Sequence, residues 1–140
     1  MSVYKHILVP TDFSDYSRHA VAKALELRAL FDARLSVLHV VDYLPPDFIA
    51  GQSGAASSPQ IIDRARQYLS EWSDQAGLAN AEQIIATGPA GREIANTARE
   101  KNVDLVVIGT SGEGGIKRLL GSTTRSVMHD PPCDVLSVHM

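Results

Sequence analysis

The sequence predicts an α/β domain built on a five-stranded, mostly parallel sheet that is doubly wound, with helices on both of its faces. Apolar runs of strand length alternate with stretches of helical period along the whole 140-residue chain. Two of those runs are apolar at nearly every position, which is typical of parallel strands buried on both faces. The length fits one domain, and we expect residues 1–140 to form it.

The first strand is expected at residues 6–10 (HILVP), an apolar run that Pro10 ends. Residues 16–31 carry apolar side chains at spacings of three and four, so they are predicted to form an amphipathic helix. Ser14 can cap that helix by accepting a hydrogen bond from a free amide of its first turn. Residues 35–41 (LSVLHVV) are nearly continuous and β-branched, as in a buried parallel strand.

Residues 43–58 interrupt the pattern with two prolines and a Gly/Ser/Ala tract, and are predicted to form a long loop. Helical period returns at residues 61–76, where Pro59 suits the first turn and Gly77 the C-terminal cap. A short strand is expected at residues 82–87.

The second half repeats the alternation. A helix is predicted at residues 89–102, and the strand at residues 104–109 (DLVVIG) has the strongest signal in the chain. A glycine-rich segment and a short helix at residues 122–129 lead to a last strand at residues 133–138. With right-handed crossovers, five strands alternating with four helices give a doubly wound sheet.

Composition excludes several classes of protein. Thirteen basic against sixteen acidic residues give a net charge of −3, which argues against binding to a nucleic acid or an anionic membrane. No apolar run approaches the roughly 18 residues that cross a bilayer, so no membrane insertion is expected. The single cysteine, Cys133, cannot form an internal disulfide, and this favours a cytoplasmic location.

The glycine-rich segment after the fourth strand is the sharpest functional signal. Backbone amides between Gly109 and Gly112 can point at one anion, and a helix opening at residues 121–123 would add partial positive charge. Residues 109–125 carry three basic side chains against one acidic, a local net of +2 in an acidic protein. The pattern therefore favours a phosphate site, although the glycines could equally serve only to turn a flexible loop.

Other chemistry finds little support. A P-loop needs Lys and Ser/Thr at the positions that Gly115 and Ile116 occupy. The residues around Ser111 read GTSGE and do not match the G-x-S-x-G motif that holds the nucleophilic serine of α/β-hydrolases. His39 is better explained as a hydrogen-bonded core residue than as a ligand. The histidines and the cysteine lack metal-binding spacing, so no metal site and no catalytic residue are predicted.

Four segments together resemble the bacterial universal stress proteins: KHILVPTDFS, LHVVD, DLVVIGTSG and GSTTRSVMHDPPCDVLSV. The resemblance spans the whole chain and is weakest in residues 43–58. It implies a flavodoxin-like sandwich, similar to the adenine nucleotide alpha hydrolases, with strand order 3-2-1-4-5. ATP-binding members carry G-x2-G-x9-G-S/T after the fourth strand, whereas here eight residues separate Gly112 from Gly121.

The resemblance also implies a ligand, ATP with Mg²⁺, and a set of contacts. Asp12, beside Pro10 and Thr11, would lie near the ribose or adenine, although Asp12 could instead be a turn or cap residue. Val40 would contact adenine. The phosphates would be held by the glycines and hydroxyls of the later segment: Gly109, Gly112, Gly121, Ser122 and Thr123.

The predicted function is therefore a universal stress protein acting as a dimeric, ATP-binding stress-response module. The homodimer would form through the last strand, residues 134–138, because an exposed apolar edge invites pairing and the resemblance implies it. The alternatives are an interaction protein that does not use ATP, and a slow ATPase. The protein partner is unknown.

Overall fold

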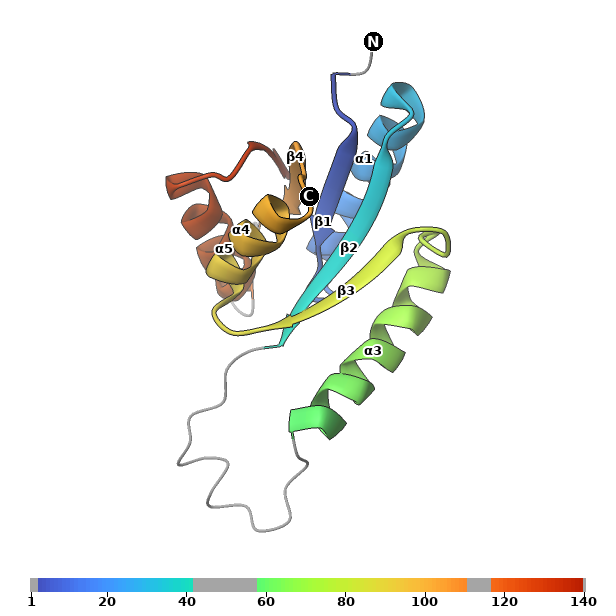
Figure 1. Ribbon diagram of the computed structural model, residues 1–140, viewed down its shortest axis with the longest axis vertical. Coiled ribbons are helices and arrows are strands. Elements are labelled where there is room, and N and C mark those ends of the chain that lie inside the picture. Colours follow the sequence, from blue (N-terminus) through green and yellow to red (C-terminus); the bar gives the residue numbers. More distant parts are fainter. Residues whose placement is uncertain (1–2, 42–57, 111–116, 140) are drawn as a thin grey trace.

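The computed structural model describes residues 3–41, 58–110 and 117–139, and the side chains of residues 58 and 117–122 fall outside that description. Helices cover both faces of a five-stranded sheet (Figure 1). The strands are β1 (His6–Pro10), β2 (Arg34–Val41), β3 (Glu82–Thr87), β4 (Leu105–Gly109) and β5 (Asp134–Val138). The helices are α1 (Asp15–Phe31), α3 (Ser58–Gln75), α4 (Ala90–Glu100) and α5 (Lys117–His129).

The strand order is β3-β2-β1-β4-β5, and every pair of neighbours is parallel. This confirms the predicted doubly wound sheet with order 3-2-1-4-5. The central strands β1 and β4 are buried along their whole length, in agreement with their continuous apolar runs. The chain builds outward from β1 in one direction, then crosses to β4 and builds in the other. The boundary between β1 and β4 is therefore the topological switch point, where such sheets bind ligands.

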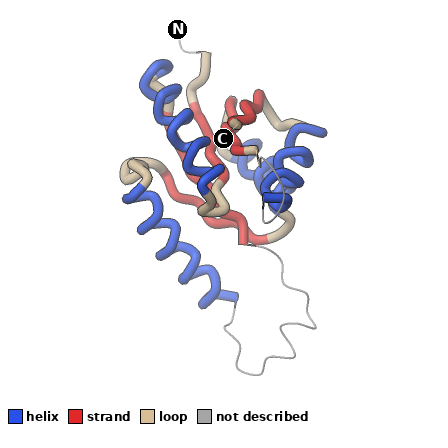
Figure 2. The backbone as a smooth tube through the Cα atoms, turned by 180° about the vertical axis from the view of Figure 1, so that it is seen from behind, coloured by secondary structure: helices blue, strands red, loops and turns tan. Residues whose placement is uncertain are grey.

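Two cores separate the sheet from its helices. Figure 2 shows α1 and α3 on one face, while α4 and α5 cover the other. Alternate residues of β1 enter opposite cores, with Ile7 and Val9 facing α1 and α3, and Leu8 facing α4 and α5. In β2, Leu38 belongs to the second core and Val40 packs against it from the strand's carboxyl end.

Most element bounds fall within three residues of the sequence predictions, and local contacts explain some differences. Asp104 lies just before β4, where its carboxylate accepts hydrogen bonds from the backbone N–H groups of Lys5 and His6, at 2.9 and 3.0 Å. Helix α4 ends at Glu100, two residues short of the predicted end, and Asn102 takes a left-handed φ of 55°.

One helix start was predicted wrongly. Helix α5 begins at Lys117, not at residue 122, so residues 121–123 lie inside it. Lys, Arg and Leu at 117–120 are good helix formers, and the roughly 1 kcal/mol that an interior glycine costs at Gly121 does not stop the helix. Only the first four amides of a helix lack an internal partner, so the backbone amides of 121–123 are not the free ones that the sequence pattern suggested.

Candidate functional site

The candidate site is the carboxyl edge of the sheet at the switch point, and its first part is the connection from β1 to α1. Pro10 is the buried last residue of β1, and Thr11 follows it, also buried. The Thr11 N–H donates to the Leu38 carbonyl (2.8 Å), and its hydroxyl donates to Ser17 Oγ (2.9 Å). The same hydroxyl accepts from the Phe13 N–H (2.9 Å). Thr11 therefore fixes the start of α1 against β2.

Asp12 is the exposed residue of this connection. Its Oδ1 accepts hydrogen bonds from the Ser14 N–H (3.0 Å) and the Ser17 hydroxyl (3.3 Å). Ser14 is the N-cap, as predicted, since its Oγ accepts from the Ser17 N–H at 3.3 Å. Asp12 thus has the turn and cap role, and it uses only one oxygen for it. Within the described residues no hydrogen bond reaches Oδ2, which leaves this oxygen available to a ligand.

Phe13 is held in a left-handed conformation with φ 67°, which is uncommon for a bulky residue. This conformation places the Phe13 ring against α3. There the ring lies 4.3 Å from His39, 4.6 Å from Tyr68 and 5.7 Å from Trp72, measured between centroids. No local pattern in the sequence relates Phe13 to residues of α3, so this cluster could not be predicted from the sequence.

His39 is hydrogen-bonded, as predicted, but it is half-buried and not a member of either core. Its Nδ1 lies 2.9 Å from the Thr11 carbonyl oxygen, which can only accept, so Nδ1 carries the proton. The His39 imidazole therefore links β2 to the β1–α1 connection, and it also contacts the Phe13 ring.

Gly109, the last residue of β4, has a role that the sequence did not indicate. A Cβ built there would collide with the carbonyl oxygen of Tyr16, so only glycine lets the first turn of α1 lie this close to β4. Its carbonyl accepts a hydrogen bond from the buried Thr124 hydroxyl of α5 (3.1 Å). Gly109 is thus required for packing, whether or not a phosphate lies nearby.

The remaining predicted residues are divided by what the structure describes. Val40 is half-buried near the carboxyl end of β2, where its aliphatic surface can meet a ligand. Gly112 lies outside the described residues, and nothing is described of the Ser122 side chain. Gly121 and Thr123 lie on α5, and Thr123 is half-buried. The structure therefore brings Pro10, Thr11, Asp12, Val40 and Gly109 to one edge of the sheet.

A search for related proteins identifies the chain. The model of the universal stress protein family matches residues 3–139. The chain belongs to the universal stress protein family. Universal stress protein A homolog 2 of Coxiella burnetii is 36% identical over 143 residues, which cover 100% of this chain and 98% of the relative.

Solved structures agree with this membership. The hypothetical protein MJ0577 matches with a TM-score of 0.77 and 26% identity, over 98% of this chain and 96% of that one. A universal stress protein in complex with cAMP matches with a TM-score of 0.69 and 28% identity, over 99% and 98% of the two chains. Nucleotide complexes therefore occur among the neighbours of this universal stress protein.

Two further groups bear on what the site can do. Burial raises the pKa of the Cys133 thiol, and the neighbouring carboxylate of Asp134 raises it further. This disfavours the reactive thiolate form of Cys133. Among the described residues, no three His, Cys, Asp or Glu side chains are grouped so that they could hold a metal ion.

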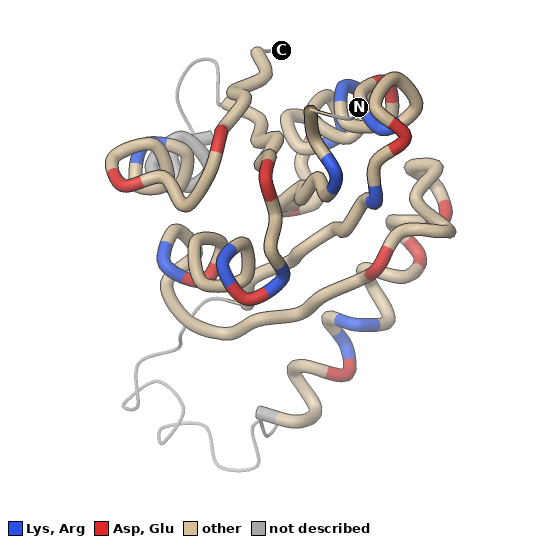
Figure 3. Tube along the Cα trace, turned by 45° about the horizontal axis from the view of Figure 1, so that its top comes forward, with Lys and Arg blue, Asp and Glu red and all other residues tan. Residues whose placement is uncertain are grey.

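Charge and hydropathy add two observations. Figure 3 shows basic and acidic residues interspersed along the described helices. Arg125, on α5, is exposed, while nothing is described of the Lys117 and Arg118 side chains. Across the described ranges, no helix is long and apolar enough to span a membrane.

Proposed function

We propose that this universal stress protein binds an adenine nucleotide, ATP with Mg²⁺, at the carboxyl edge of β1, β2 and β4, and that it acts as a nucleotide-dependent module of the stress response in the cytoplasm. The observation that carries the proposal is Asp12, an exposed carboxylate at the switch point with one oxygen left over from its capping role. The cAMP complex of a neighbour that is 28% identical supports it.

The predicted residues divide into those that would contact the nucleoside and those that would hold the phosphates. Asp12 Oδ2 accepts a hydrogen bond from a ribose hydroxyl, while Oδ1 keeps its bonds to the start of α1. Val40 offers apolar contact to the adenine. The phosphates extend toward the end of β4, where Gly109, Gly112, Gly121, Ser122 and Thr123 hold them and the Mg²⁺ that they bind.

A second candidate is an interaction protein of the same fold that does not use ATP. The early start of α5 favours it, because the backbone amides of residues 121–123 are then engaged inside the helix. Slow ATP hydrolysis is a third outcome, and it would show as phosphate release in the same binding assays.

The test is calorimetric titration with ATP of the purified protein and of two matched variants. Asp12→Asn keeps an Oδ1 acceptor for the Ser14 amide but removes the charge, so binding should weaken about tenfold. Asp15→Asn removes one charge from the first turn of α1, three residues away, and should bind as wild type does. Absence of ATP binding by the wild type, together with absence of nucleotide after denaturation, would leave the ATP-independent function.

We also propose that the protein is a homodimer that pairs through β5 (Asp134–Val138). β5 lies at the edge of the sheet, and β4 is its neighbour there. Its burial is incomplete, and Leu136 has 37% of its surface exposed. An exposed strand edge with apolar side chains is a template for pairing with another chain.

Light scattering after size exclusion measures this state directly. Leu136→Arg should convert the dimer to a monomer, because it places an unpaired charge in the interface. Leu30→Arg is the matched control, since Leu30 is 74% exposed on α1, and it should leave the mass unchanged. A monomeric wild type would contradict the proposal.

A further inference from the structure

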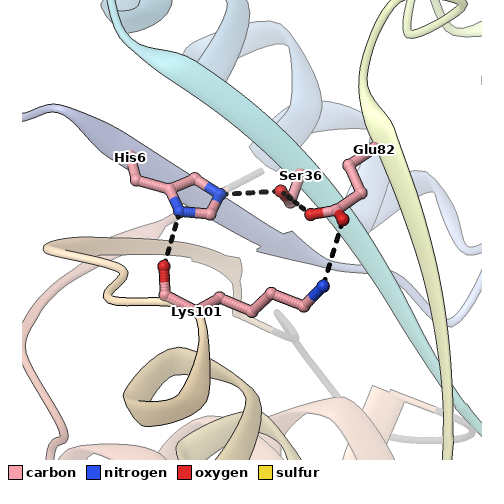
Figure 4. A network of polar contacts seen from close by, with 4 residues as sticks. All are labelled: His6, Ser36, Glu82 and Lys101. Atoms are coloured by element: carbon pink, nitrogen blue, oxygen red, sulfur yellow. Dashed lines mark hydrogen bonds and ion pairs between the residues drawn. The ribbon is translucent and has the colours of Figure 1, made fainter.

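A polar network with two buried members, His6 and Ser36, and a partly exposed ion pair, Glu82 with Lys101, joins β1, β2, β3 and the end of α4 at the amino edge of the sheet, the edge opposite the candidate site (Figure 4). His6 is 3% exposed and Ser36 is 1% exposed. His6 Nδ1 lies 3.0 Å from the Lys101 carbonyl oxygen, and Nε2 lies 2.7 Å from Ser36 Oγ. Ser36 Oγ lies 3.1 Å from Glu82 Oε1, and Lys101 Nζ lies 3.0 Å from Glu82 Oε2.

The protons available to this network can be counted. A carbonyl oxygen only accepts, so His6 Nδ1 carries a proton. A serine hydroxyl has one proton, and because a carboxylate only accepts, the 3.1 Å contact with Glu82 is a hydrogen bond only if Ser36 donates that proton to Glu82. The short contact between Ser36 Oγ and His6 Nε2 is then a hydrogen bond only if Nε2 also carries a proton. The closed network therefore requires His6 as an imidazolium.

The neutral ring cannot make the same set of bonds. If Nε2 lacks a proton, Ser36 must donate to it, and the Ser36 oxygen then faces the Glu82 carboxylate with no proton between them. Glu82 does not supply a proton, because the hydrogen bond from the Lys101 ammonium holds the pKa of its carboxyl below the usual range and the Ser36 hydroxyl adds to this. His6 and Ser36 are buried, while the side chains of Glu82 and Lys101 are 42% and 38% exposed, so the cost of the missing bond falls on the buried Ser36 hydroxyl.

The charges around His6 come from every element packed against it. Glu82 on β3 and Asp104 before β4 are carboxylates, and Asp104 accepts from the His6 backbone N–H (3.0 Å). Lys101 at the end of α4 and Lys5 before β1 are ammonium groups. Lys101 is paired with Glu82. Ser36 is almost fully buried within this arrangement, so its contact with His6 is not an accessible nucleophile–base pair.

We propose that this network is a proton-dependent clamp on the amino edge of the sheet. With both nitrogens of His6 protonated, a continuous chain of hydrogen bonds ties β1 and β2 to Glu82 at the start of the edge strand β3 and to the end of α4. Loss of one proton breaks the chain at Ser36. Acidification therefore tightens the attachment of β3, and alkaline conditions loosen it.

The protonation state is measured directly by nitrogen NMR of the histidine rings in the full chain. At about pH 5.5, where the proposal has the network closed, both His6 nitrogens should carry protons and show couplings to them. His39 is the internal comparison for His6 at about pH 8. The one hydrogen bond described for the His39 ring, from Nδ1 to the Thr11 carbonyl, needs a proton on Nδ1 only. A His6 ring with one proton at about pH 5.5 would overturn the proposal.

Stability gives the second readout. A folded state that binds a proton more tightly than the unfolded chain is most stable at low pH and loses that stability as pH rises. Between about pH 5.5 and about pH 8, the unfolding equilibrium constant of the wild type should rise about tenfold more than that of Ser36→Ala, which cannot bridge His6 to Glu82. His6→Gln should match Ser36→Ala, and the exposed-site control His129→Gln should match the wild type.

Amide hydrogen exchange locates the effect. The amides at the start of β3 should lose protection at alkaline pH in the wild type, relative to those of β4, and this difference should be absent in Ser36→Ala. If His6→Gln does not fold, the wild type and Ser36→Ala still decide the question. A pH dependence that Ser36→Ala retains in full would contradict the clamp.

Discussion

Replacement of Gly109 by alanine is the perturbation whose result the structure specifies most closely. The new Cβ would lie against the carbonyl carbon and oxygen of Tyr16, in the first turn of α1. Backbone atoms cannot turn aside as a flexible side chain can, so α1 must shift away from β4. The backbone at Gly109 does not have a positive φ, so the cost is steric and not conformational.

The magnitude follows from two contributions. Overpacking of a close contact costs about 1–3 kcal/mol, and a clash with backbone belongs at the upper end. The shift also strains the hydrogen bond from the Thr124 hydroxyl to the Gly109 carbonyl, whose full loss costs about 1 kcal/mol. We expect Gly109→Ala to lower the free energy of unfolding by about 3 kcal/mol and the melting temperature by about 10 °C.

Urea unfolding followed by tryptophan fluorescence measures this loss. The chain has one tryptophan, Trp72. It lies on α3, is 4% exposed and packs in the core that α1 and α3 form with the sheet. Thr124→Val is the matched control, because it removes the hydroxyl that bonds the Gly109 carbonyl without placing a Cβ against Tyr16, and it should cost about 1 kcal/mol. A Gly109→Ala protein within about 0.5 kcal/mol of the wild type would refute the packing role of this glycine.

Two further predictions concern the helix start and the acid limb of stability. Ser14→Ala removes the N-cap of α1 and should lower the free energy of unfolding by about 1 kcal/mol in urea titrations, whereas Ser126→Ala, at an exposed position inside α5, should change it little. The hydrogen bonds from Lys101 and Ser36 lower the pKa of the Glu82 carboxyl below its ordinary value of 4.5. The ionised carboxylate therefore stabilises the fold above that ordinary value, and this stabilisation is lost as the pH falls through the lowered pKa. Thermal melts between about pH 6 and about pH 3 should show a steeper loss for the wild type than for Glu82→Gln, and parallel curves would contradict this.

Hydrophobic pattern predicted the secondary structure well because it depends on neighbours along the chain. Continuous apolar runs identified β2 and β4, and the spacing of apolar residues identified α1, α3 and α4. The start of α5 was misjudged because glycines were taken as loop residues, whereas a glycine can lie inside a helix that its neighbours stabilise.

The candidate site was predicted in part. Placing Asp12 and Val40 at one edge follows from parallel topology, which brings the carboxyl ends of the strands together. The capping bonds of Asp12 connect residues close in sequence, and the cap role was among the expectations. The close approach of Tyr16 to Gly109 connects residues far apart in sequence, so no local pattern could reveal it.

The sequence by itself therefore determined the family, the order of strands and helices, and the edge of the sheet where polar residues and glycines gather. These depend on local periodicity and on motifs read along the chain. The tertiary structure decided that Gly109 is needed for packing, that Phe13 reaches under α3, and that His6, Ser36, Glu82 and Lys101 share one set of protons. Such roles depend on distances between residues that are remote in the chain, which only the packed fold brings within a few ångströms.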